Sequence, residues 1–94
     1  MAKLLSPSEI EESISKLSGW TLAEKKIQST RKFKDFIAAI NFVNQLVEPA
    51  ESAGHHPDLE ISYNKVTISL TTHDAGGLTE QDFQLAAKIS EINE

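Results

Sequence analysis

The sequence LEISYNKVTISLT, residues 59–71, shows the clearest strand pattern in the chain. Apolar and polar side chains alternate in residues 59–63 and again in residues 66–70, which is the period of two that half-buried strands show. Asn64 and Lys65 separate the two runs, and asparagine accepts the positive φ of a tight turn. The stretch therefore predicts a β-hairpin. Its predicted cross-strand pairs are Tyr63 with Val66, Ile61 with Ile68, and Leu59 with Leu70.

A helix and another hairpin are predicted before this stretch. The sequence SPSE at residues 6–9 has an N-cap serine, a proline at the first helical position and a glutamate at the third, which together form a helix start signal. Gly19 is expected to end that helix. Residues 20–22 and 27–33 then favour two short strands, joined by a turn near residues 24–26.

Residues 35–53 predict a longer helix between the two hairpins. Pro49 lies inside it and removes a backbone N–H, so we expect a kink or a break with a restart there. Gly54 is expected to end the helix. The predicted core-facing stripe consists of Phe36, Ile40, Val43, Val47 and Ala50.

A last helix is predicted after the Gly76-Gly77 loop, with Thr79 as N-cap and Asp82 at its third position. Two hairpins separated by helices favour an α+β fold, in which helices cover one face of an antiparallel sheet. Because 94 residues are too few to build two cores, we expect one domain over residues 1–94.

Composition excludes several classes of protein. The chain has 9 Lys+Arg against 14 Asp+Glu, a net charge of −5, which makes it a poor partner for nucleic acid. It has no cysteine, so disulfide scaffolds, thiolate zinc sites and iron–sulfur clusters are excluded. No apolar run approaches the roughly 20 residues of a membrane span, and the start turns polar too soon for a signal peptide. We expect a cytoplasmic protein that binds no membrane.

All three histidines of the chain are predicted to meet at the open end of the 59–71 hairpin. If the predicted pairing continues beyond the strands, His56 lies opposite His73 and His55 opposite Asp74. Imidazoles give and take protons near neutral pH, so such a cluster would suit a reaction that needs an acid and a base at neighbouring atoms.

Carboxylates are expected to support this cluster. Glu51 precedes His55 by four residues, so a helical turn would bring its carboxylate near that ring, and Asp82 approaches from the last helix. Two other interpretations stay open: exposed loop histidines without a function, and a zinc site. The adjacent His55 and His56 point in different directions and no His-Glu-x-x-His spacing occurs, so we expect no metal.

The spacing of these residues resembles the signature of the pterin-4a-carbinolamine dehydratases. The match runs from Glu51 over three residues to His55-His56, six to Tyr63, nine to His73 and eight to Asp82. The surrounding motifs also match: His55-His56-Pro57-Asp58, Tyr63-Asn64-Lys65-Val66, Thr72-His73-Asp74, Gly77-Leu78-Thr79, the opening Leu5-Ser6-x-x-Glu9-Ile10 and Gly19-Trp20. The resemblance covers nearly the whole chain.

The resemblance implies a four-stranded antiparallel sheet with three helices packed on one face, assembled as a homodimer or homotetramer. It implies loss of water from a 4a-hydroxytetrahydropterin to give quinonoid dihydropterin, which recycles the cofactor of aromatic amino acid hydroxylases without any metal or organic cofactor. Leu59 stands where relatives often have an aromatic residue, which predicts weaker pterin binding. By position, the implied catalytic residues are His55, His56 and His73, the pterin contacts are Pro57, Thr72, Asp74 and Ala75, and the supporting residues are Glu51 and Asp82.

A second function is also compatible with the resemblance. Some members of the family act as dimerisation cofactors of a homeodomain transcription factor. The alternative prediction is therefore a protein-binding module without catalysis, whose acidic surface argues against direct contact with DNA.

Overall fold

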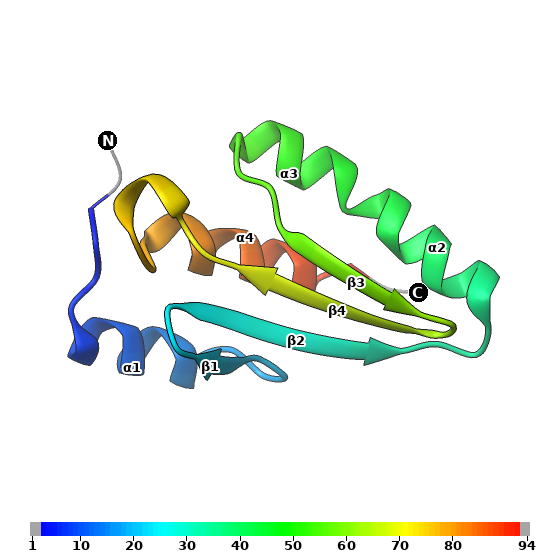
Figure 1. Cartoon of the computed structure of the whole chain (residues 1–94), viewed down its shortest axis with the longest axis horizontal. Coiled ribbons are helices and arrows are strands. Elements are labelled where there is room, and N and C mark those ends of the chain that lie inside the picture. Colours follow the sequence, from blue (N-terminus) through cyan, green and yellow to red (C-terminus); the bar gives the residue numbers. More distant parts are fainter. Residues whose placement is uncertain (1–2, 93–94) are drawn as a thin grey trace.

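The computed structural model describes residues 3–92. Its centre is a four-stranded sheet in which every neighbouring pair is antiparallel and the strand order is β1-β2-β4-β3 (Figure 1). β2 and β4 are therefore the central strands, and β3 is an edge. The strands are β1 Thr21–Ala23, β2 Lys26–Lys32, β3 Asp58–Ser62 and β4 Lys65–Leu70.

The helices cover one face of this sheet, which confirms the α+β prediction of three helices on one side (Figure 1). The predicted second helix consists of two successive segments. The helical elements are α1 Pro7–Ser15, α2 Phe36–Gln45, α3 Val47–Ala53, the 3₁₀ turn η1 His73–Ala75 and α4 Glu80–Ser90. No helix within residues 3–92 has the length and apolar character needed to cross a membrane.

The two faces of the sheet differ in polarity. Ile27 pairs with Leu70, and both are fully buried with Ile68 beneath the helices. On the other face the central strands are joined by polar pairs, such as the hydroxyls of Thr30 and Thr67 at 3.0 Å. This alternation is what places the hydrophobic core on the helical side.

The predicted hairpin forms, but its register is shifted. Leu59 pairs with Ile68 and Ile61 pairs with Val66, so the turn falls at residues 63–64. The reason is a tertiary contact: the Asn64 side chain donates to the Phe33 carbonyl at 2.8 Å, and the Phe33 N–H donates to the Asn64 carbonyl at 2.7 Å. The shift moves each partner by two residues, so every side chain keeps its face.

The first helix begins as predicted and ends earlier. Ser6 and Glu9 form the capping box, but α1 ends at Ser15 and not near Gly19. The N–H groups of the next two residues bond to carbonyls three positions back, which closes the helix in a tight last turn. Gly19, at φ +84°, serves the turn into the buried Trp20.

The predicted break near Pro49 is confirmed, while the predicted core stripe is correct for Ala50 and Val43 and wrong for Phe36 and Val47. Helix α2 gives way to α3 at Leu46. The side chains buried against the core are Ala39, Phe42, Leu46 and Ala50, whereas Phe36 and Val47 are 50% and 58% exposed. Residues 36–43 are apolar on more than one side of α2, so the spacing alone could not identify the side that faces the sheet.

Candidate active site

The end of α3 determines where the first two histidines lie. Gly54 adopts the left-handed conformation, with φ 61° and ψ 31°, and terminates the helix. The His55 N–H then donates to the Ala50 carbonyl at 3.1 Å. The chain turns sharply here, so His55 and His56 leave the helix at the end of the sheet where β4 finishes.

The third histidine comes from the loop after β4. Thr72 forms a bridge with Gly77, with the Thr72 N–H donating to the Gly77 carbonyl at 3.0 Å. This bridge closes a short loop that contains η1, and His73 is its first residue. The loop therefore carries His73, Asp74 and Ala75 as one unit.

The three histidines border one cavity of about 560 Å³. Of the nine site residues predicted from the sequence, six line this cavity: His55, His56, Thr72, His73, Asp74 and Ala75. Gly54, Thr71 and Gln81 complete the lining. The predicted convergence of the imidazoles is thus present despite the shifted hairpin register.

Asp82 lies behind the cavity and is completely buried. Its Oδ1 is 2.6 Å from His55 Nε2. Its Oδ2 accepts hydrogen bonds from the Thr72 hydroxyl at 2.8 Å and from the Thr79 N–H at 2.9 Å. The Thr79 hydroxyl is 2.8 Å from that of Thr72, so one carboxylate joins the start of α4, the end of β4 and the His55 ring.

Glu51 contacts a different histidine from the one predicted. Its Oε2 lies 2.6 Å from His56 Nε2, and the side chains are 68% and 62% exposed, respectively. The prediction paired Glu51 with His55 because it assumed that the helix continues through that residue. The left-handed turn at Gly54 ends the helix first, and His55 points instead to Asp82.

These contacts define which ring nitrogens are available. Ionised carboxylates accept hydrogen bonds, so His55 and His56 carry their protons on Nε2 when neutral, and Nδ1 is then a proton acceptor. His73 makes no side-chain hydrogen bond within residues 3–92 and is exposed at the cavity wall. The site thus combines two oriented imidazoles with a third that is free to contact a ligand.

Four residues that the sequence singled out lie outside the cavity lining: Glu51 and Asp82, which contact its histidines, and Pro57 and Leu59. Leu59 lies in β3 and is 36% exposed, and the weaker pterin binding expected from it stays a prediction. Gln81 is a lining residue that the sequence reasoning missed. The sequence places Gln81 between the N-cap Thr79 and Asp82. A polar residue at such a position usually faces solvent, so this place alone did not mark Gln81 as a site residue.

Within residues 3–92, no set of three or more His, Asp or Glu side chains is arranged to hold a metal ion. Each carboxylate in contact with a histidine engages a different ring, Asp82 on His55 and Glu51 on His56. The arrangement is therefore suited to moving protons with oriented imidazoles.

Curated relatives match almost the whole chain. A protein from Nostoc sp. (strain PCC 7120), named as a candidate pterin-4-alpha-carbinolamine dehydratase, is 73% identical over 93 residues, covering 99% of this chain and all of the relative. A protein from Acidobacterium capsulatum with the same name is 53% identical over 88 residues, 94% of this chain and 96% of its own length.

Solved structures agree with these relatives in fold. A transcriptional coactivator/pterin dehydratase from Brucella melitensis has 38% identity and a TM-score of 0.87, over 92% of this chain and 94% of the other. A pterin dehydratase-like protein identified as a RuBisCO assembly factor in the alpha-carboxysome has 20% identity and a TM-score of 0.63, over 77% and 86%, which is a likeness of fold alone.

The family model described as pterin 4 alpha carbinolamine dehydratase matches residues 3–92, which is every residue of the chain that the structure describes. On this match and on the identity to its relatives, the chain belongs to the pterin-4a-carbinolamine dehydratase family.

Proposed function

We propose that this chain is a dehydratase that removes water from a 4a-hydroxytetrahydropterin and releases quinonoid dihydropterin, a step in pterin recycling. The observation that carries the proposal is the single cavity bordered by His55, His56 and His73, two of which are oriented by carboxylates. Membership of the family supports the same reaction.

The reaction needs two proton transfers at adjacent atoms. The bond between C4a and the hydroxyl oxygen breaks, and an acid protonates that oxygen so that it leaves as water. A base removes the proton from N5, and the electron pair released there forms the C4a–N5 double bond. Each transfer is typically worth 10²–10⁴-fold in rate, and neither requires a metal or an organic cofactor.

We assign the two proton transfers to the histidines and substrate contact to the loop around η1. Two of the three imidazoles act as the acid and the base, and the third orients the pterin. Thr72, Asp74 and Ala75 line the cavity and are suited to contacting the planar edge of the ring. Pro57 follows the histidine pair and keeps its place as a proposed contact from the family resemblance.

Single replacement of each histidine tests the proposal. We expect His55→Ala, His56→Ala and His73→Ala to lower the enzyme-dependent rate of carbinolamine dehydration, measured by stopped-flow absorbance, and at least two of them by 10²-fold or more. Gln84→Ala, an exposed position on α4, is the matched control and should keep the wild-type rate. Unchanged rates in all three histidine variants, with circular dichroism unchanged, would contradict the proposal.

The alternative function is a protein-binding module. It is favoured by the name of the Brucella relative, which combines a transcriptional coactivator with a dehydratase. Binding to a protein partner that survives loss of all three histidines, in a chain that shows no turnover, would support the module.

We also propose that the chain works as an assembly of identical copies in the cytoplasm. Large exposed apolar side chains are concentrated on α2, α3 and the β3 edge. These are Phe36, Ile37, Val47, Leu59, Ile61 and Tyr63.

A further inference from the structure

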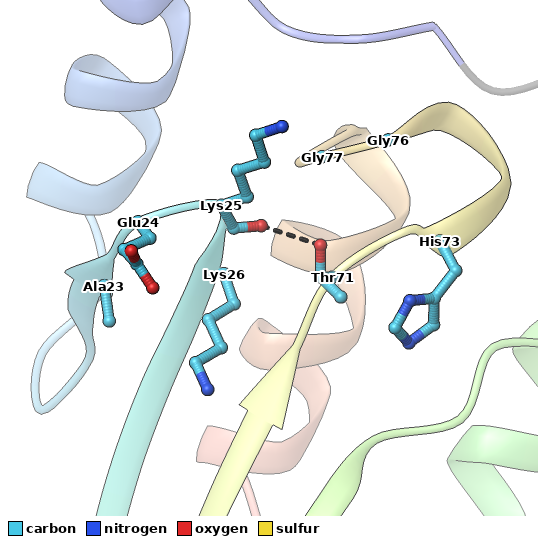
Figure 2. Close-up of a pocket in the computed structure, with 8 residues that line it drawn as sticks. All are labelled: Ala23, Glu24, Lys25, Lys26, Thr71, His73, Gly76 and Gly77. Atoms are coloured by element: carbon cyan, nitrogen blue, oxygen red, sulfur yellow. Dashed lines mark hydrogen bonds between the residues drawn. The ribbon is translucent and has the colours of Figure 1, made fainter.

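A second cavity adjoins the histidine cavity and has no role in the reaction proposed above. Its volume is about 510 Å³, and Thr71 and His73 line both cavities. Its far wall is the turn between β1 and β2, where Glu24, Lys25 and Lys26 lie (Figure 2). The Thr71 hydroxyl donates to the Lys25 carbonyl at 2.7 Å, so this turn is tied to the end of β4.

The turn gives the second cavity a local charge opposite to that of the chain. Its lining residues include two lysines and one glutamate, whereas the whole protein has a net charge of −5. Neither lysine forms an ion pair within residues 3–92. Figure 2 shows Lys25 extending on the side of the Gly77 turn, while Lys26 and Glu24 point the other way. Lys25 and Glu24 therefore extend to different sides of the turn.

Pterin chemistry connects the two cavities. In a tetrahydropterin the reacting atoms C4a and N5 are bonded to each other, and C6 is bonded to N5. A substituent on C6 therefore leaves the ring beside the atoms on which the histidines act. With the ring in the histidine cavity and C6 turned towards Thr71 and His73, which line both cavities, such a substituent would reach the lysine-lined cavity.

We propose that the lysine-lined cavity is a subsite for an anionic group, a phosphate or a carboxylate, carried on the C6 substituent of the pterin. Exposed ammonium groups attract such anions, and a neutral substituent gains nothing from them. The inference rests on the proposed function, because it presumes that a pterin occupies the histidine cavity. It defines the substrate class as pterins with a negatively charged C6 side chain.

Calorimetric titration tests the subsite with three stable probes: 6-hydroxymethyl-7,8-dihydropterin, its phosphate ester, and 6-carboxy-7,8-dihydropterin. We expect an anionic probe to bind about tenfold more tightly than the neutral alcohol at 50 mM salt and to lose this preference at 0.5 M salt. A preference for either anion supports the subsite and shows which group it takes. Equal affinity for all three probes would overturn it.

Charge variants test whether these side chains cause the preference for anionic probes, because removing a positive charge should weaken it and removing the negative charge should strengthen it. Lys25→Met should reduce it, Lys25→Met with Lys26→Met should abolish it, and Glu24→Gln should increase it. Lys65→Met is the matched control, because Lys65 begins β4 at the opposite end of the strand, about 17 Å from Leu70 at a strand rise of ~3.3 Å per residue. A preference that the double variant retains would overturn the proposal.

Turnover of a neutral substrate separates this proposal from the one on which it rests. Wild-type protein is assayed with the 4a-carbinolamine of 6-methyltetrahydropterin, which has no anionic group. Enzyme-dependent turnover without any anion preference would overturn the subsite alone. Absence of turnover of this substrate and also of the 4a-carbinolamine of a 6-carboxy-tetrahydropterin, together with a lysine-dependent anion preference, would overturn the dehydratase proposal and leave the anion subsite supported.

Discussion

At the scale of single residues, Asp82 links the histidine cavity to the rest of the molecule. It is fully buried, and its two oxygens face three different groups: His55 Nε2, the Thr72 hydroxyl and the Thr79 N–H. A carboxylate only accepts hydrogen bonds, so all three groups must act as donors. Asp82 therefore determines which nitrogen of His55 carries the proton.

We predict that Asp82→Asn reverses this tautomer. The Thr79 backbone N–H is always a donor, so the asparagine oxygen must face it and the NH₂ group must face His55 Nε2. That nitrogen would then become the acceptor, and the ring proton would move to Nδ1. We expect kcat to fall 10²–10⁴-fold and the free energy of unfolding to fall by about 1–3 kcal/mol.

Nitrogen-15 NMR of the imidazoles reports the tautomer directly, beside stopped-flow rates and urea denaturation. The matched control is Asp35→Asn, since Asp35 caps α2 through the Ala38 N–H and asparagine caps equally well. It should leave both rate and stability unchanged. An Asp82→Asn protein with the original tautomer and the wild-type rate would contradict the role assigned to Asp82.

The sequence predicted which histidines meet, but not which carboxylate holds which ring. The Thr79–Asp82 capping pair is visible as a local pattern, whereas the contacts of Asp82 with His55 and Thr72 join positions 27 and 10 residues away. Glu51 was paired with the wrong ring because spacing rules assume an unbroken helix. Which carboxylate each histidine meets depends on the backbone turn at Gly54, and the spacing of residues in the sequence does not give the direction of that turn.

At the scale of elements, the break between α2 and α3 explains why Pro49 is tolerated. Helix α3 begins at Val47, so Pro49 is its third residue. The first backbone bond of the new helix runs from the Ala50 N–H to the Leu46 carbonyl at 3.1 Å. Backbone N–H groups in a first turn have no partner within the helix, so a proline there loses no hydrogen bond.

We therefore predict that Pro49→Ala leaves the free energy of unfolding unchanged or lowers it by up to about 1 kcal/mol, because proline restricts the unfolded chain. If Pro49 interrupted a continuous helix, its removal would instead raise stability by about 3 kcal/mol. Urea denaturation distinguishes the two results. Ser52→Ala, at an exposed position of the same helix, controls for the change in helix propensity.

Elements whose signals are local were predicted well. The serine–proline start of α1 and the break near Pro49 both depend on neighbouring residues alone. The side of α2 that faces the core was predicted only in part, and the register of the β3–β4 hairpin was predicted wrongly. Both are determined by distant contacts, such as the packing of Phe42 on Phe33 at 5.1 Å and the bond from Asn64 to Phe33.

At the scale of the whole molecule, most of the large apolar side chains that remain exposed outside the core lie on or beside the β3 edge. Leu59 and Ile61 lie on the helical side of the sheet, because they pair with Ile68 and Val66, yet they are 36% and 43% exposed. Within residues 3–92, β3 has one sheet neighbour, β4, so its outer backbone groups face away from the sheet. An antiparallel edge is self-complementary about a twofold axis, which suits pairing with a second copy.

We predict that the wild-type chain is a dimer or tetramer at micromolar concentration, with a mass of at least twice the 10.4 kDa of one copy. Ile61→Lys places a charge in the apolar surface and repels its symmetry mate, so light scattering after gel filtration should give 10.4 kDa. Thr30→Lys, on the exposed polar face of the sheet, should keep the wild-type mass. Because assembly stabilises the folded state by mass action, the melting temperature of the wild type should rise with protein concentration and that of Ile61→Lys should not. A wild-type mass of 10.4 kDa throughout would show that this surface does not join copies of the chain.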